Sequence, residues 1–251
     1  MCYNTNENDF VGGMMKNRIL VFEENFNEGP LPNEEYWDYD IGGGGWGNRE
    51  LQYYTRANLE NIKIEDGILK ITAIEKEVDG HPITSTRLVS RGKKHWLYGR
   101  FEIKAKLPKG TGTWPAVWTL GIDEENAGWP AMGEIDIIEH VGRDQDTLHF
   151  SLHTGKYNHK TRTQITHVVK HEGVSESFHD YTLDWDEEKI AFEVDGVEQC
   201  RFYKKDYADS WPFDAPHYLI LNVAIGGGFG GEADMSCLPA TMEIESIRIY
   251  Q

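Results

Sequence analysis

Apolar and polar residues alternate with a period of two along most of this chain, and no long stretch keeps the 3.6-residue period of a helix. The clearest alternation lies in residues 100–107, 148–153 and 190–195, which predicts strands with one apolar and one polar face. Residues 217–224 are more continuously apolar, as in a strand buried on both faces. Many short strands separated by turn residues predict an all-β fold, an antiparallel β-sandwich of jelly-roll type.

The chain has 251 residues, a length that fits one large β-domain. Glycine-rich segments at residues 42–45 and 226–231 indicate turns, and no repeat or linker indicates a second domain. We therefore predict a single domain over residues 19–251. Residues 1–18 are rich in polar residues and predict a flexible N-terminal arm. They lack the apolar core of a secretory signal, so we expect a protein that stays inside the cell or a trimmed form of a secreted one.

The net charge of −17 limits the partners of this chain. Nucleic acids and anionic membranes need clustered Lys and Arg, so neither is expected as a partner, whereas a neutral glycan fits. No segment approaches the roughly 20 apolar residues of a membrane span. The three cysteines, Cys2, Cys200 and Cys237, are too few for a disulfide scaffold and have no metal-binding spacing. We expect a monomer.

Residues 133–140 hold three acids in a short apolar run. Glu134 and Asp136 are two positions apart, so on a strand they share a face. Glu139 is five positions from Glu134 and would point into the apolar layer of a regular strand. A β-bulge around Ile137 and Ile138 would return Glu139 to the face of the other two acids. Neighbouring carboxylates repel one another, so this arrangement points to chemistry rather than to stability.

Two glutamates across a sugar linkage can carry out retaining glycoside hydrolysis. With a rise of ~3.3 Å per residue, their backbones are separated by roughly 13 Å, and inward-leaning side chains could approach the ~5 Å that a retaining enzyme needs. We interpret Glu134 as the nucleophile and Glu139 as the acid/base, its pKa raised by burial and by neighbouring charge. Asp136 would hold Glu134 through a hydrogen bond or a shared proton. A solvated acidic strand edge, or a cation site made of the same acids, is the alternative.

Aromatic residues and histidines flank these acids. Trp114 and Trp118 share a strand face, and Trp129 lies shortly before Glu134. Indole rings stack on the apolar faces of sugars, so we expect at least two of these side chains to line a cleft, although any one alone could fill the core. His153, in phase with His149, would lie on a polar face, where it could bind a sugar hydroxyl, orient an acid or be structural.

The chain resembles glycoside hydrolase family 16, specifically its laminarinase (endo-β-1,3-glucanase) group. The likeness spans most of residues 19–251 and rests on residues 48–55, 85–92, 98–108, 112–118, 134–139, 152–158, 178–185, 221–227 and 247–250. It implies a curved jelly roll with a concave substrate cleft and retention of configuration. Two residues, rather than one, separate Asp136 from Glu139, as in the laminarinase group. The substrate contacts that it implies are Asn48, Arg87, Trp114, Trp118, Trp129 and His153.

Three of the residues around the implied cleft also have structural interpretations. Trp46 could top the cleft or anchor a loop, Arg87 could serve as a surface ion-pair partner, and Asn48 could be a turn residue. The resemblance further implies an extracellular enzyme with no cofactor for catalysis. It also implies a structural calcium ion on the convex side, held by Glu23 or Glu24, Gly67 and Glu245, the last at a position that is usually Asp.

The expected activity is a retaining endo-hydrolysis of β-1,3-glucans, and of mixed β-1,3/1,4-glucans. Three alternatives share parts of this prediction: a lichenase or a hydrolase of sulfated galactans, a transglycosylase, and a glucan-binding module without catalysis. Sulfate recognition would call for more Arg and Lys, and a binding module typically lacks the catalytic acids, all three of which are present here.

Overall fold

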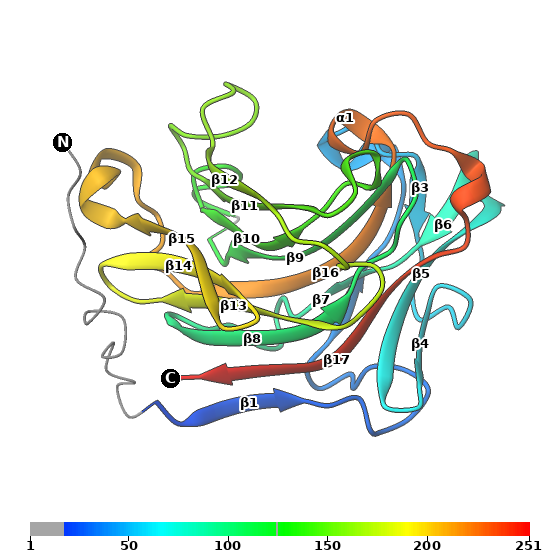
Figure 1. Cartoon of the computed structure of the whole chain (residues 1–251), viewed down its shortest axis with the longest axis horizontal. Coiled ribbons are helices and arrows are strands. Elements are labelled where there is room, and N and C mark those ends of the chain that lie inside the picture. Colours follow the sequence, from blue (N-terminus) through cyan, green and yellow to red (C-terminus); the bar gives the residue numbers. More distant parts are fainter. Residues whose placement is uncertain (1–17, 124) are drawn as a thin grey trace.

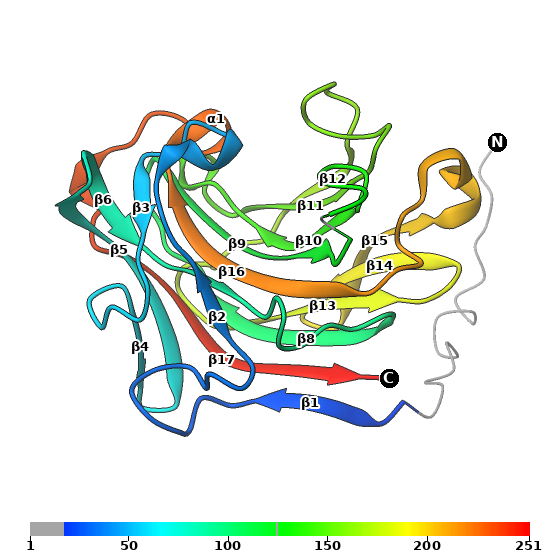
Figure 2. The same cartoon turned by 180° about the vertical axis from the view of Figure 1, so that it is seen from behind.

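The computed structural model describes residues 18–123 and 125–251, so that all but Arg18 of the predicted N-terminal arm (residues 1–18) lies outside the described residues. Two stacked, curved β-sheets form a sandwich, and the views from both sides show them as separate layers (Figures 1 and 2). The predicted all-β jelly-roll sandwich is confirmed.

The larger sheet has ten strands. They are β1 (Leu20–Glu24), β3 (Gln52–Tyr54), β4 (Ile62–Glu65), β5 (Ile68–Val78), β6 (His81–Ser85), β8 (Gly99–Lys106), β13 (His179–Trp185), β14 (Lys189–Val194), β15 (Val197–Tyr203) and β17 (Ala240–Tyr250). Their order is β15-β14-β13-β8-β17-β5-β6-β3, with β1 paired to β17 and β4 paired to β5. One pair, β3 with β6, is parallel, and the other strand pairs are antiparallel.

The smaller sheet has seven strands. They are β2 (Asp38–Asp40), β7 (Arg87–Val89), β9 (Thr113–Gly121), β10 (Glu134–Glu139), β11 (Thr147–His153), β12 (Ile165–Lys170) and β16 (His217–Ile225), in the order β12-β11-β10-β9-β16-β7-β2. The described helices are short: α1 (Gly227–Gly230) and the 3-10 turns Gly44–Gly47, Gly142–Asp144, Lys204–Asp206, Ala208–Ser210 and Met235–Cys237. No helix in the described ranges has the length and apolarity to cross a membrane.

The core lies between the two sheets. The inward-facing residues of β8, Phe101, Ile103 and Ala105, are fully buried, as their alternation predicts. Every residue of β16 is buried because one of its faces meets the core and the other lies under the cleft-side side chains. The Asp195-Gly196 turn joins β14 to β15 with both residues at positive φ, which suits a tight hairpin.

The bulge predicted in the acidic strand is present. In the pairing of β10 with β9, Asp136 lies opposite Trp118 and Ile138 lies opposite Val117, which leaves Ile137 as the extra residue. Ile137 and Ile138 are both fully buried although they are adjacent in the sequence. The strand therefore presents Glu139 on the same face as Asp136, away from the core.

Candidate active site

A cavity of about 700 Å³ lies over the seven-stranded sheet. Its lining includes all ten predicted catalytic and substrate-binding residues: Trp46, Asn48, Arg87, Trp114, Trp118, Trp129, Glu134, Asp136, Glu139 and His153. They come from the loop before β3, from β7, β9, β10 and β11, and from the loop before β10. The structure thus brings together residues as far apart in the sequence as Trp46 and His153.

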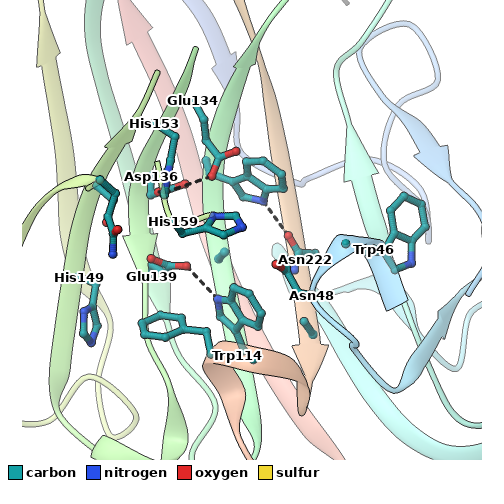
Figure 3. A pocket seen from close by; sticks show the side chains of 18 of the residues that line it. Trp46, Asn48, Trp114, Glu134, Asp136, Glu139, His149, His153, His159 and Asn222 are labelled. Atoms are coloured by element: carbon teal, nitrogen blue, oxygen red, sulfur yellow. Dashed lines mark hydrogen bonds and ion pairs between the residues drawn. The ribbon is translucent and has the colours of Figure 1, made fainter. Parts of the chain in front are cut away.

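The three acids form a column along β10 (Figure 3). Two of them have an indole as hydrogen-bond donor: Trp129 Nε1 donates to Glu134 Oε2 at 2.6 Å, and Trp114 Nε1 donates to Glu139 Oε1 at 3.0 Å. The two Trp residues are therefore partners of the acids as well as surfaces for a ligand. Charge-assisted hydrogen bonds of this kind favour the ionised carboxylate.

His153 lies opposite Glu134 on the neighbouring strand β11. Its Nε2 atom is 3.3 Å from Asp136 Oδ2 and 3.6 Å from Glu134 Oε1. The ring is almost fully buried, with 6% exposure. The sequence left three roles open for His153: binding a sugar hydroxyl, orienting an acid, or a structural role. These distances support the role of orienting an acid.

Burial dominates the electrostatics of the three acids. Desolvation, followed by the charge of Asp136, raises the pKa of Glu134 to about 8. Desolvation also raises the pKa of Asp136 to about 7 and that of Glu139 well above its usual value. The cluster therefore holds protons at neutral pH, and the groups titrate as an interacting set.

A second group of lining residues surrounds Arg87. Its guanidinium carbon lies 4.8 Å from the ring centroids of both Trp46 and Trp118. Its Nε atom also lies 3.0 Å from Asp40 Oδ2. The predicted ion-pair role is thus real, but the pair is largely buried, and Arg87 holds the two indoles in place at the cleft.

A hydrogen-bonded network under this region was missed from the sequence. Glu50 accepts hydrogen bonds from Asn48 at 3.0 Å, from Gln52 at 2.7 Å and from the Tyr54 hydroxyl at 3.4 Å. Asn222 donates to the same hydroxyl at 3.1 Å and accepts the Trp118 indole N–H at 2.7 Å. The period-two spacing of Glu50, Gln52 and Tyr54 was a sequence signal that they share a face. The network links Asn48 to Trp118 and fixes both.

The walls of the cleft come from loops and edge positions that the sequence did not single out. His159 packs on Trp129 with ring centroids 4.8 Å apart, and the Lys160 ammonium lies 4.5 Å from the same indole. At the Glu139 end, Phe229 contacts Trp114 at 5.4 Å and His149 at 4.9 Å. Nothing in the periodicity marks these residues, because His159 and Lys160 lie between β11 and β12 and Phe229 lies in the single-turn helix α1.

The carboxylates of the predicted calcium site have protein partners in the structure. Glu23 Oε1 accepts from Arg248 Nε at 2.8 Å, and Glu245 Oε2 pairs with Lys104 Nζ at 2.6 Å. Glu24 accepts from the Phe26 backbone N–H at 3.1 Å and from the Trp37 indole at 3.3 Å. A calcium ion held by Glu23 or Glu24, Gly67 and Glu245 would compete with these partners, and the site stays a prediction.

Comparison with known proteins agrees with this geometry. The family Glycosyl hydrolases family 16 matches residues 46–242. A beta-glucanase of Rhodothermus marinus is 44% identical over 243 residues, which cover 92% of this chain and 85% of the relative. The X-ray structure of the laminarinase from Rhodothermus marinus superposes with a TM-score of 0.90 at 43% identity, covering 93% of this chain and 97% of that one.

A further structure contains a bound sugar. It is a mutant of a non-specific endo-β-1,3(4)-glucanase from family GH16, co-crystallised with 1,3-β-D-cellotriosyl-glucose. It matches with a TM-score of 0.90 at 39% identity, over 94% of this chain and 95% of that one. The resemblance inferred from the motifs is confirmed, and the chain belongs to glycosyl hydrolases family 16.

Proposed function

We propose that this protein is a retaining endo-hydrolase of β-1,3-glucans of the laminarin type, which also accepts mixed β-1,3/1,4-glucans. The observation that carries the proposal is the column of Glu134, Asp136 and Glu139 in an aromatic-lined cleft. The similarity to a non-specific endo-β-1,3(4)-glucanase supports both linkages. The proposed partner is a β-glucan chain, and we propose that the protein acts as a monomer.

In the first step Glu134 attacks the anomeric carbon and the glycosidic C–O bond breaks. Glu139 gives its proton to the leaving oxygen, and a glycosyl ester of Glu134 remains. In the second step Glu139, now a carboxylate, takes a proton from water while the water oxygen attacks the anomeric carbon. The ester bond breaks and Glu134 is released, so that the configuration is retained.

This mechanism needs the proton on Glu139 and a negative charge on Glu134. The Trp129 N–H and the nearby His153 ring both favour ionised Glu134 and oppose the desolvation that raises its pKa to about 8, so turnover should increase with pH as Glu134 loses its proton. Glu139 accepts the Trp114 N–H, and burial raises its pKa well above the usual value, which favours its protonated form. We assign Asp136 to positioning, since it lies between the two glutamates and against His153.

The cleft favours attack within a polymer. Its lining runs across the sheet from Arg87 on β7 to Thr166 and Val168 on β12. A bound chain would cross several strands, with sugar rings on either side of the acids. The reaction uses only carboxylates and water, so it takes no cofactor, and calcium forms no part of the proposal.

Laminarin digestion followed over time tests the proposal. A spread of oligomers should appear early, with the β-anomer formed first. Glucose or a single dimer from the start would contradict endo action, and products longer than the substrate would indicate a transglycosylase.

Two variants test the acids. Glu134→Gln and Glu139→Gln should each reduce kcat by about 10²-fold or more, because each removes a group that acts in the transition state. Binding of long β-1,3-glucan oligomers should remain measurable by calorimetry. The matched control is Glu77→Gln, which changes an exposed glutamate of β5 and should leave kcat unchanged. Near-normal turnover in either cleft variant would refute the assignment.

A further inference from the structure

Two histidines and one aspartate converge at a second place, away from the cleft. His171 follows β12, His179 begins β13, and Asp195 lies in the turn between β14 and β15. His171 Nε2 is 3.1 Å from His179 Nδ1 and 3.2 Å from Asp195 Oδ2, and His179 Nδ1 is 2.8 Å from the same oxygen. None of the three residues lines the cleft. Three atoms with lone pairs thus form a small triangle.

The hydrogen bonds around His179 decide what this triangle can hold. Its other ring nitrogen, Nε2, lies 3.2 Å from the carbonyl oxygen of Gly173, which can only accept, and 3.1 Å from the Ser177 hydroxyl, which can donate or accept. The contact with Gly173 is a hydrogen bond in the tautomer that carries the hydrogen on Nε2. In a neutral imidazole the Nδ1 atom is then bare and points its lone pair at the Asp195 carboxylate. Two lone pairs at 2.8 Å repel one another unless a cation lies between them.

A proton on His179 Nδ1 can serve as that cation, because this N–H can donate to Asp195 Oδ2 at 2.8 Å and toward a bare His171 Nε2 at 3.1 Å. A metal ion is the alternative that uses all three atoms as ligands. The Gly173 carbonyl then has the role that a backbone carbonyl typically has beside a metal-binding histidine, which is to accept the other ring N–H and fix the tautomer.

The surroundings hold the three ligands in position. The second oxygen of Asp195, Oδ1, accepts the backbone N–H of Asp180 at 2.9 Å, which turns Oδ2 toward the histidines. The two imidazole rings are nearly perpendicular, at 88°, so each directs one nitrogen to the same point. Relative exposures of 24% for His171, 12% for His179 and 43% for Asp195 leave one side open to solvent.

We propose that His171, His179 and Asp195 bind a Zn²⁺ ion with water as the fourth ligand. Ligand atoms about 2.0–2.1 Å from a tetrahedral zinc are separated by roughly 3.3 Å, so the triangle needs to widen by only a few tenths of an ångström. Two imidazole nitrogens and one carboxylate favour zinc over magnesium or calcium, which prefer oxygen ligands. The ion would tie the segment after β12 to the β14–β15 hairpin and so connect the edges of the two sheets (Figure 1).

Calorimetric titration of the untagged protein with ZnCl₂ tests the site, with MgCl₂ as the selectivity control. We expect one Zn²⁺ per chain, no comparable binding of Mg²⁺, and a rise in Tm of about 5 °C when zinc is at 100 times its Kd. His171→Gln and Asp195→Asn should each weaken the binding by at least about tenfold. Asn tolerates the positive φ of 50° at position 195, so the second variant keeps the turn.

Two controls separate this site from other places where zinc could bind. His167→Gln changes a β12 histidine outside the triangle and should leave the affinity unchanged. Asp136→Asn alters the Glu134–Asp136–His153 cluster of the cleft, which could also attract a metal, and should likewise leave the affinity unchanged. The proposal would be overturned if the protein did not bind one Zn²⁺ per chain. It would also be overturned if His171→Gln bound zinc as tightly as the original protein, or if only Asp136→Asn lost the binding.

Discussion

Two indole N–H groups reach two different carboxylates in the cleft. Trp129 donates to Glu134, and Trp114 donates to Glu139. Each bond stabilises the charged form of an acid that burial pushes toward the neutral form. Desolvation therefore favours the neutral acids, the indole N–H groups favour the charged ones, and the balance between the two sets the protonation of the cluster. A single hydrogen bond to the nucleophile should be visible in the pH dependence of the reaction.

Trp129→Phe tests that balance. Phenylalanine keeps an aromatic surface but removes the N–H, so the pKa of Glu134 should rise further and the acidic limb of the kcat/KM profile should move to higher pH. The control is Trp118→Phe, which removes an indole N–H that serves Asn222 instead of a carboxylate. It should weaken substrate binding and leave the acidic limb in place. Equal shifts in both variants would mean that the bond to Glu134 does not set its ionisation.

At the scale of single elements, the bulged strand β10 was predictable because its polarity pattern breaks the period of two at one point. Glu134 and Asp136 fix one face, and Glu139 belongs to that face only if one residue is added between them. The alternation in residues 100–107 and 148–153 likewise predicted β8 and β11 and the cleft-facing His149 and His153. The sequence was sufficient to predict these side chains because residues two apart on a strand share a face.

Other parts of the fold left no such local signal. The parallel pairing of β3 with β6 depends on how distant segments meet, and local periodicity does not encode it. Lys160 reaches the cleft from the loop after β11 and Phe229 from the short helix α1, and the path of both segments is set by tertiary contacts. Lys104 and Arg248 lie beside Glu245 and Glu23 through the pairing of distant strands, so residue types alone did not reveal these ion pairs.

Ile137→Ala and Ile138→Ala test the bulge itself. Both side chains are fully buried, so each variant should lower the free energy of unfolding by about 2–5 kcal/mol. Chemical denaturation monitored by tryptophan fluorescence measures this. Ile122→Ala, at a loop position with 47% exposure, should change it by less than about 0.5 kcal/mol. In a strand without the bulge, one of the two isoleucines would face the cleft. Its replacement by alanine would then change the free energy of unfolding very little.

On the scale of the whole molecule, buried titratable groups of opposite kinds shape the dependence of stability on pH. Burial lowers the pKa of His140 to about 4 and that of His217 to about 3, so the unfolded chain binds more protons at these sites below pH 6.5. The cleft acids act in the other direction, since their raised pKa values let the folded protein hold more protons than the unfolded chain. Between about pH 4 and 6.5 the two contributions oppose one another, because the histidines make stability rise with pH and the acids make it fall. Above pH 6.5 only the acids contribute, so stability should fall with pH up to about 8.

Asp136→Asn tests the falling part of this curve. Between pH 6.5 and 8 the folded protein loses the proton of a group with a pKa of about 7, whereas the unfolded chain has already lost it. Each such proton is worth up to about 1.4 kcal/mol of unfolding free energy per pH unit. The variant should therefore show a flatter curve in this window and a higher stability at pH 8. Asp79→Asn, at an exposed turn, should reproduce the original slope. A slope unchanged by Asp136→Asn would mean that this carboxyl group does not gain its proton on folding.

The division of the cleft between sheet and loops has an evolutionary consequence. The acids and the indole-bearing strand β9 belong to a hydrogen-bonded sheet, while His159, Lys160 and Phe229 project from connecting segments. Insertions or exchanges in those segments can remodel the ends of the groove without disturbing strand register. Descendants of one such scaffold can therefore diverge in the polymers they select while inheriting the same bond-breaking apparatus.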